Sequence, residues 1–250
     1  MAGLGGSVDL ATAEQLFAAG RVLAESAQLR ATLADPAING DAKAGLIGKV
    51  FGTKLGKSAS TLLLAAVSSG WSSQDDLLSG IEDLALRVTA IAAPAKLSID
   101  SELFAFARVV ASDNELELAL GTKLGDSSAK SGLVASLLGG KASESTIVIV
   151  SALVQQPLGR RVGALLAHAA EVVADQSGES IATVTSAAPI AASQLVSLTK
   201  SLTKIYGREL RLNLVIDSSI IGGLRVQVGD DVIDGSVSSR ITDLRLQLAG

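Results

Sequence analysis

The chain has 250 residues, of which 48% are hydrophobic, 18% charged and 2% aromatic, with a formal net charge of −4 and no cysteine. This composition excludes a disordered chain, and the missing thiols exclude disulfides and thiolate metal sites. The acidic balance and the scarcity of aromatic rings argue against nucleic-acid binding, which needs basic and stacking surfaces. The longest apolar run, residues 62–67, is too short to insert into a membrane, and the first residues show no secretory leader, so export is not expected.

The first third of the chain carries apolar residues at helical spacing. This pattern predicts helices over residues 10–33, 41–51 and 58–69, and a fourth helix from residue 74 to a break at Pro94. Pro36 is expected to end the first of them, because the residue before a proline avoids the helical conformation.

The chain then repeats itself at an offset of 87 residues, which is the separation of Leu16 from Leu103. The same offset places Lys43 on Lys130, and a one-residue slip is needed only beyond residue 71. Chance similarity between alanine-rich helices would not keep one register through several loops. The sequence therefore predicts two tandem copies of one helical bundle, at residues 10–96 and 97–178.

From residue 179 onward the periodicity changes, which predicts an α+β domain at 179–250. A strand around Ile181 is followed by a helix over 191–206, which Gly207 closes, and then by alternating strands. The last residues carry one apolar stripe at helical spacing. The expected order is β-α-β-β-β-α, so the fold class is mainly α with a small α+β C-terminal domain.

The most informative stretch, residues 217–236, is D-S-S-I-I-G-G-L-R-V-Q-V-G-D-D-V-I-D-G-S. This ordered set of turns and strands resembles the C-terminal domain of the δ subunit of F-type ATP synthases, the family of the mitochondrial oligomycin-sensitivity-conferring protein. The resemblance covers the predicted C-terminal domain closely and the rest by helix pattern only. Family members commonly carry one helical bundle, so the duplicated chain is similar to the elongated δ subunits of actinobacteria.

The resemblance implies a role in ATP synthesis and hydrogen ion transport without catalysis. A δ subunit is a structural part of the peripheral stalk, or stator, and holds the catalytic head, CF(1) or its equivalent, against the torque of the rotor. The implied partners are the N-terminal helix of an α subunit and the b subunit, which some relatives carry as a fused segment. The implied location is peripheral, on the cytoplasmic face of the bacterial cell membrane, with no direct membrane insertion, no nucleic acid and no cofactor.

The family resemblance also implies where the partners bind. Two helices of a bundle form a groove for the α-subunit helix, and they map to residues 10–24 and 58–69 in one copy and to 102–111 and 143–155 in the other. The partner-binding residues expected in this way, with the apolar stripe of the last helix, are Leu16, Phe17, Leu63, Val67, Phe104, Val150, Val154, Val237, Ile241, Leu244 and Leu248. The alternative is that the residues in the bundles fill their cores, which use the same helical positions.

No catalytic, cofactor-binding or metal-binding residue is expected. Residues 51–58 resemble a phosphate-binding loop, but the spacing is one residue short and the segment follows a predicted helix instead of a strand. His168 is the only histidine and has no neighbouring ligand or nucleophile in the sequence. The remaining alternative is a non-enzymatic adaptor or an RNA-binding module of an unrelated pathway, since a small sheet can bind RNA. Its strands would need aromatic residues, and the predicted strands have none.

Overall fold

The structure is a computed structural model that describes residues 8–94, 97–122, 126–229 and 231–237. The chain divides into two compact units, Met1–Val173 and Ala174–Gly250. The two predicted helical copies fall in the first unit, apart from the last residues of the second copy. The described part of the second unit, beyond the end of α10, is a small sheet with one helix.

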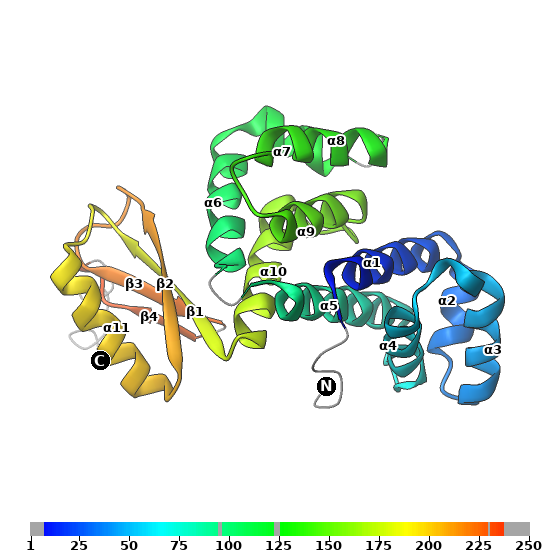
Figure 1. The fold of residues 1–250 in the computed structure, drawn as a ribbon. Coiled ribbons are helices and arrows are strands. Elements are labelled where there is room, and N and C mark those ends of the chain that lie inside the picture. The colour runs from blue at the N-terminus through cyan, green and yellow to red at the C-terminus, as the bar shows by residue number, and fades with distance from the viewer. Residues whose placement is uncertain (1–7, 95–96, 123–125, 230, 238–250) are drawn as a thin grey trace, which may run out of the picture. The chain divides into compact units, whose positions relative to one another are not determined.

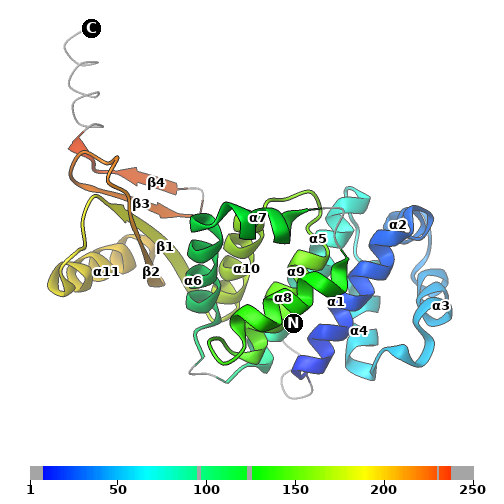
Figure 2. The ribbon, with the colours of Figure 1, turned by 90° about the horizontal axis from the view of Figure 1, so that it is seen from above.

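The first unit contains helices throughout its described residues (Figures 1 and 2). In the first copy these are α1 (Leu10–Glu25), α2 (Ala27–Ala34), α3 (Gly40–Phe51), the short 3₁₀ helix η1 (Gly52–Lys54), α4 (Lys57–Ser68) and α5 (Gln74–Ala92). In the second copy they are α6 (Ile99–Ser112), α7 (Asn114–Gly121), α8 (Ser127–Leu138), α9 (Glu144–Gln155) and α10 (Val162–Gln176). Helices α1 and α5 lie side by side and share much of the core of the first copy.

The single helix predicted over residues 10–33 is wrong, because the structure divides it at Ser26. This residue has an extended backbone (φ −118°, ψ 99°) and ends α1, and its hydroxyl accepts a hydrogen bond from the N–H of Leu29 at 3.3 Å to start α2. A serine oxygen can replace a helical backbone partner in this way, which apolar periodicity alone does not reveal. The second copy divides at the equivalent position, Asp113, whose side chain caps α7.

Two long-range hydrogen bonds recur in both copies at the predicted offset. The side chain of Gln15 accepts from the N–H of Gly56 at 2.6 Å, and that of Glu102 accepts from the N–H of Ser143 at 3.0 Å. Both bonds join residues 41 positions apart and tie the first helix of a copy to the start of its apolar helix.

Each copy also buries one lysine against the C-terminal end of its apolar helix. The Nζ atom of Lys43 donates to the carbonyl of Val67 at 3.1 Å, and that of Lys130 to the carbonyl of Val154 at 3.5 Å. An ammonium group there satisfies carbonyls that have no partner within the helix and suits the negative end of the helix dipole. Such recurring polar contacts support a duplication independently of the alanine-rich composition.

The second unit contains a four-stranded mixed sheet with strand order β2-β1-β3-β4. Strand β1 pairs in parallel with β2 and antiparallel with β3, and β3 pairs antiparallel with β4. The elements are β1 (Glu179–Ser186), α11 (Ala192–Tyr206), β2 (Glu209–Ile216), β3 (Leu224–Val228) and β4 (Asp231–Asp234). The predicted fold class is confirmed, and the final helix predicted after β4 lies outside the described residues except for its first position, Val237.

One face of the sheet packs on α11 to form the core of this unit, which includes Ala182, Val184, Leu202, Leu210, Val226 and Val228. The Gly-Gly turn before β3 explains part of the sequence motif of residues 217–236. Gly222 and Gly223 have φ values of +66° and +83°, and a Cβ atom on Gly223 would lie 2.4 Å from the carbonyl oxygen of Gly235. Both the backbone conformation and the close approach require glycine at position 223.

Trp71 packs against Gly80 on α5, and its indole N–H donates to the carbonyl of Ala66 at 2.8 Å. A Cβ atom on Gly80 would lie 1.9 Å from the indole ring. We expect Gly80→Ala to displace the ring and to lower the free energy of unfolding by about 1–3 kcal/mol, as overpacking does. Urea unfolding followed by the fluorescence of Trp71, the only tryptophan, measures both effects.

The matched control is Gly132→Ala in α8, where a Cβ atom meets nothing within 4 Å. Alanine is the better helix former, so this change should stabilise the chain by about 0.5–1 kcal/mol. If Gly80→Ala behaved like Gly132→Ala and left the tryptophan spectrum unchanged, the packing of Trp71 on α5 would be disproved.

Candidate interaction surfaces and the junction between the helical copies

Most of the residues expected to line partner grooves are buried in the helical unit. The buried members of that set are Leu16, Phe17, Leu63, Val67, Val150 and Val154. Their burial places these side chains in the cores of the two copies, and Phe17 also lines a groove between the copies. Phe104 is partly exposed and Val237 is exposed, whereas Ile241, Leu244 and Leu248 lie outside the described residues.

A groove of about 560 Å³ lies between the first helix of the first copy and two helices of the second copy. Its α1 wall includes Phe17, Ala18 and Arg21, and its α9 wall includes Ile147 and Val148. The groove therefore combines the α1 surface of one copy with the apolar-helix surface of the other. The family resemblance implies partner binding by both kinds of surface, but within each copy separately.

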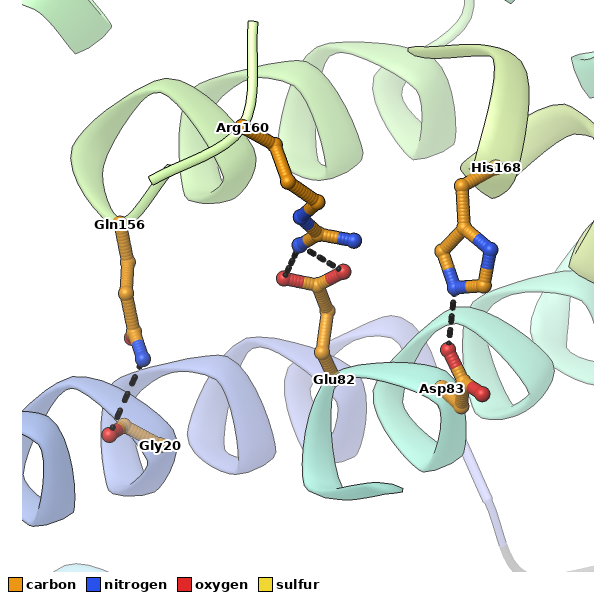
Figure 3. Close-up of polar contacts among 6 residues, drawn as sticks. All are labelled: Gly20, Glu82, Asp83, Gln156, Arg160 and His168. Carbon is orange, nitrogen blue, oxygen red and sulfur yellow. Dashed lines mark hydrogen bonds and ion pairs between the residues drawn. The ribbon is translucent and has the colours of Figure 1, made fainter. Parts of the chain in front are cut away.

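The two copies are joined by an ion pair that the sequence did not suggest (Figure 3). Glu82 on α5 of the first copy is 8% exposed, and the Nη2 atom of Arg160 lies 2.7 Å from each of its carboxylate oxygens. Arg160 belongs to the segment that connects α9 and α10. A carboxylate buried to this extent requires such a cation, because an unpaired buried charge is strongly destabilising.

Two further contacts lie on either side of this pair (Figure 3). The Nε2 atom of His168 on α10 lies 2.7 Å from Oδ1 of Asp83, and the side-chain amide of Gln156 donates to the carbonyl of Gly20 on α1 at 3.4 Å. The expectation that His168 stands alone is therefore wrong. Its carboxylate neighbours come from the other copy, and only the packing of the copies brings them together.

The protonation of these groups depends on their surroundings. Burial raises the pKa of Glu82, and the hydrogen bond and charge of Arg160 offset that effect only in part. The hydrogen bond to Asp83 raises the pKa of His168, and partial burial opposes this rise. Both groups therefore hold a proton more tightly than they would in the unfolded chain.

The side-chain atoms of Glu82, Asp83 and His168 lie within 4.8 Å of one another, close enough for one metal ion. However, Arg160 engages both oxygens of Glu82, which leaves two available protein ligands where a zinc site has three or four. We therefore assign no metal to this cluster. The near-match to a phosphate-binding loop also has the wrong context, because it spans the end of α3, η1 and the start of α4.

The second unit exposes several large apolar side chains, which are Val196, Ile205, Ile216, Ile221, Val232, Ile233 and Val237. Val232 and Ile233 lie on β4, an edge strand in the described part of the sheet. Exposed apolar residues at a sheet edge are typical of a surface that another segment covers. Among the described residues, no helix is long and apolar enough to cross a membrane.

Comparison with known proteins identifies the family. The family model "ATP synthase delta (OSCP) subunit" matches residues 85–248. An ATP synthase subunit delta of Leifsonia xyli is 54% identical over 250 residues, which cover 100% of this chain and 94% of the relative. This chain belongs to the ATP synthase δ (OSCP) subunit family. A δ subunit of Streptomyces avermitilis is 39% identical over 97% of this chain and 90% of its own length.

The δ family model begins at residue 85, close to the predicted start of the second copy, whereas the bacterial δ relatives match nearly the whole chain. The first copy is thus shared with those relatives and lies mostly outside the general family pattern. Among solved structures, a chain of the mitochondrial ATP synthase hexamer of Toxoplasma gondii aligns with a TM-score of 0.45 at 20% identity, over 68% of this chain and 96% of that chain.

Proposed function

We propose that the chain is the δ subunit of the peripheral stalk of an F-type ATP synthase. In this role it connects the catalytic head to the b subunit, resists rotor torque and catalyses no reaction itself. The observation that carries the proposal is the 54% identity, over the whole chain, to a protein named ATP synthase subunit delta. The proposed location follows from the role and is the cytoplasmic face of the bacterial cell membrane.

The helical unit is proposed to receive the N-terminal helix of an α subunit. Helix-in-groove binding requires an accessible apolar strip beside polar rims. The groove between α1, α8 and α9 has apolar walls, and Glu14, Gln15 and Gln155 are among its polar lining residues. Phe104 and Val109 on α6 offer a second partly apolar surface, with Val109 exposed.

The C-terminal unit is proposed to bind the b subunit through its exposed apolar residues and the stripe of Val237, Ile241, Leu244 and Leu248. The described apolar residues include the β4 pair Val232 and Ile233. An RNA-binding or unrelated adaptor role is set aside, because the chain belongs to the δ family and β2 and β3 carry no aromatic residue.

Two variants of the full chain test this division of partners. Ile241→Asp/Leu244→Asp should weaken binding to the purified soluble part of b at least tenfold and leave binding of an α-subunit N-terminal peptide unchanged. Ala18→Asp/Val148→Asp, which places charges on the α1 and α9 walls of the groove, should have the opposite effect. A lost hot-spot residue costs about 2 kcal/mol or more, and about 1.4 kcal/mol is a factor of ten. Fluorescence anisotropy with each labelled partner measures both affinities.

Leu118→Asp is the matched control, because Leu118 is 72% exposed on α7 and belongs to neither proposed surface. It should leave both affinities unchanged, and far-ultraviolet circular dichroism should show that all three variants are folded. The proposed division between the two units would be contradicted if one double variant lost affinity for both partners. It would also be contradicted if neither double variant lost affinity for either partner.

A further inference from the structure

The junction between the copies is built from one short segment of the second copy. Gln156, Arg160 and His168 contact Gly20 on α1 and the adjacent residues Glu82 and Asp83 on α5. Consecutive residues of a helix point about 100° apart. The pairs at Glu82 and Asp83 therefore constrain both the rotation and the translation of residues 160–168 along α5, and the contact at Gly20 adds a third point on another helix.

The turn that presents Arg160 has an unusual backbone. Leu158 has a φ of +48° and Gly159 a φ of +79°, and the N–H of Arg160 donates to the carbonyl of Pro157 at 2.9 Å. A leucine in the left-handed region costs free energy and persists only where its surroundings fix it. The strained turn positions Arg160 next to Glu82. We therefore infer that the turn helps to hold the two copies together at the junction.

The junction residues occur only on the faces by which the two copies meet. With the one-residue slip of the repeat, the positions equivalent to Glu82 and Asp83 in the second copy are Ala170 and Glu171. The positions equivalent to Arg160 and His168 in the first copy are Ser72 and Gly80. A third bundle could not be added by the same contacts at either end. The charged residues therefore specify a single pair of bundles and not an open-ended array of bundles.

We propose that Gln156, Arg160 and His168 form a clamp that fixes the two helical copies in a single orientation, and that the clamp loosens when His168 loses its proton. The clamp makes two bundles act as one body. Desolvation cancels much of the attraction within a buried ion pair, so we assign to this pair the choice of one arrangement and little net stability. The proposal does not depend on which partners the chain binds.

The pH dependence follows from the groups that face His168. These are Asp83 and Glu82 from α5 and Arg160 from the segment before α10. In the sequence, Arg87 follows one turn later in α5, and Glu171 lies three residues after His168 in α10. Asp83 raises the pKa of His168 above its ordinary value of 6.5, so the stabilisation is complete below 6.5 and is lost as pH rises through the higher folded value. Glu82 has to be ionised to pair with Arg160, so the loosening at high pH is assigned to His168 alone.

The test measures the distance between the two copies in the full chain. The protein has no cysteine, so Lys49→Cys on α3 and Ser136→Cys on α8, two exposed and equivalent positions, accept spin labels specifically. Double electron–electron resonance spectroscopy should give one narrow distribution of the distance between the two spin labels at pH 6, and a modestly broader distribution at pH 8.5. His168→Gln should be broader at pH 6 and lose this pH dependence.

Glu82→Gln/Arg160→Met removes both members of the buried pair, so that no charge is left buried without a partner. We expect this variant to keep the helical circular dichroism and cooperative melting of the unsubstituted protein but to at least double the width of the distance distribution. Arg211→Met is the matched control, because it breaks the Arg211–Glu179 ion pair at the start of the sheet and should leave the distribution narrow.

A narrow distribution in both junction variants at both pH values would overturn the proposal. It would show that packing of α9 on α1 and α5 holds the copies together without the clamp. Equal broadening in Arg211→Met would also overturn it, because the effect would then not belong to the junction. If Glu82→Gln/Arg160→Met lost its helical circular dichroism signal, His168→Gln would be the deciding variant, because that substitution removes no buried charge pair.

Discussion

Leu16→Ala and Leu103→Ala should each lower the free energy of unfolding of the helical unit by about 2–5 kcal/mol, the usual cost of a leucine-sized cavity. The two leucines are equivalent positions of the repeat, and both are 0% exposed. Because one compact unit contains nearly all of both copies, we expect them to unfold together. Leu103→Ala should therefore shift the urea midpoint of Trp71 fluorescence as Leu16→Ala does, although Trp71 lies in the other copy.

Leu118→Ala controls for changes at the surface, because Leu118 is 72% exposed, and its effect should stay within about 0.5 kcal/mol. A second probe, far-ultraviolet circular dichroism, should give the same midpoint as fluorescence in every variant. If Leu103→Ala shifted only the circular dichroism midpoint and left the tryptophan midpoint unchanged, the copies would be independent folding units.

The sequence predicted the fold class because each element carries its own signal. The alternation from Leu210 to Ile216, the stripe of α5 and the turn at Gly222 and Gly223 are all local patterns that burial and backbone sterics impose. The division at Ser26 was missed because a serine cap resembles any polar position of a helix.

The junction could not be predicted, because its partners are far apart in the chain and come from different copies. Glu82 and Arg160 are 78 residues apart, and Asp83 and His168 are 85 residues apart. One sequence-level signal was present. Residues 155–161 of the second copy, Q-Q-P-L-G-R-R, include two arginines, whereas residues 68–73 of the first copy, S-S-G-W-S-S, include none. Read as a contact site between the copies, that asymmetry would have pointed to Arg160.

The expected groove residues show a related limit. Apolar spacing on a helix identifies the face that is buried but not what buries it. Leu63 and Val150 lie in the cores of their own copies, whereas Phe104 stays partly exposed on α6 with the same type of pattern. Only the packing of neighbouring helices distinguishes a core position from a groove position.

Removal of one full period, residues 16–102, should give a folded chain with reduced stability. The deletion takes 87 residues from 250 and leaves 163, with a single bundle before the C-terminal domain. It joins Gln15 to Leu103 within one helix, where Gln15 replaces Glu102. Gln15 already accepts a hydrogen bond from the N–H of Gly56, so it can accept the equivalent bond from the N–H of Ser143.

The same deletion removes α5 and most of α1, so Arg160 and His168 lose Glu82 and Asp83, and α9 loses the first copy as a packing partner. Ile99, which is buried, is replaced by Thr12, a further loss in the core. We expect a cooperative urea transition with a lower midpoint and a smaller denaturant dependence, because less surface is exposed on unfolding.

The deletion should also abolish the rise in stability on lowering the pH from 8 to 6, since Asp83 no longer raises the pKa of His168. A product with helical circular dichroism but no cooperative transition would show instead that the second copy needs the first in order to fold.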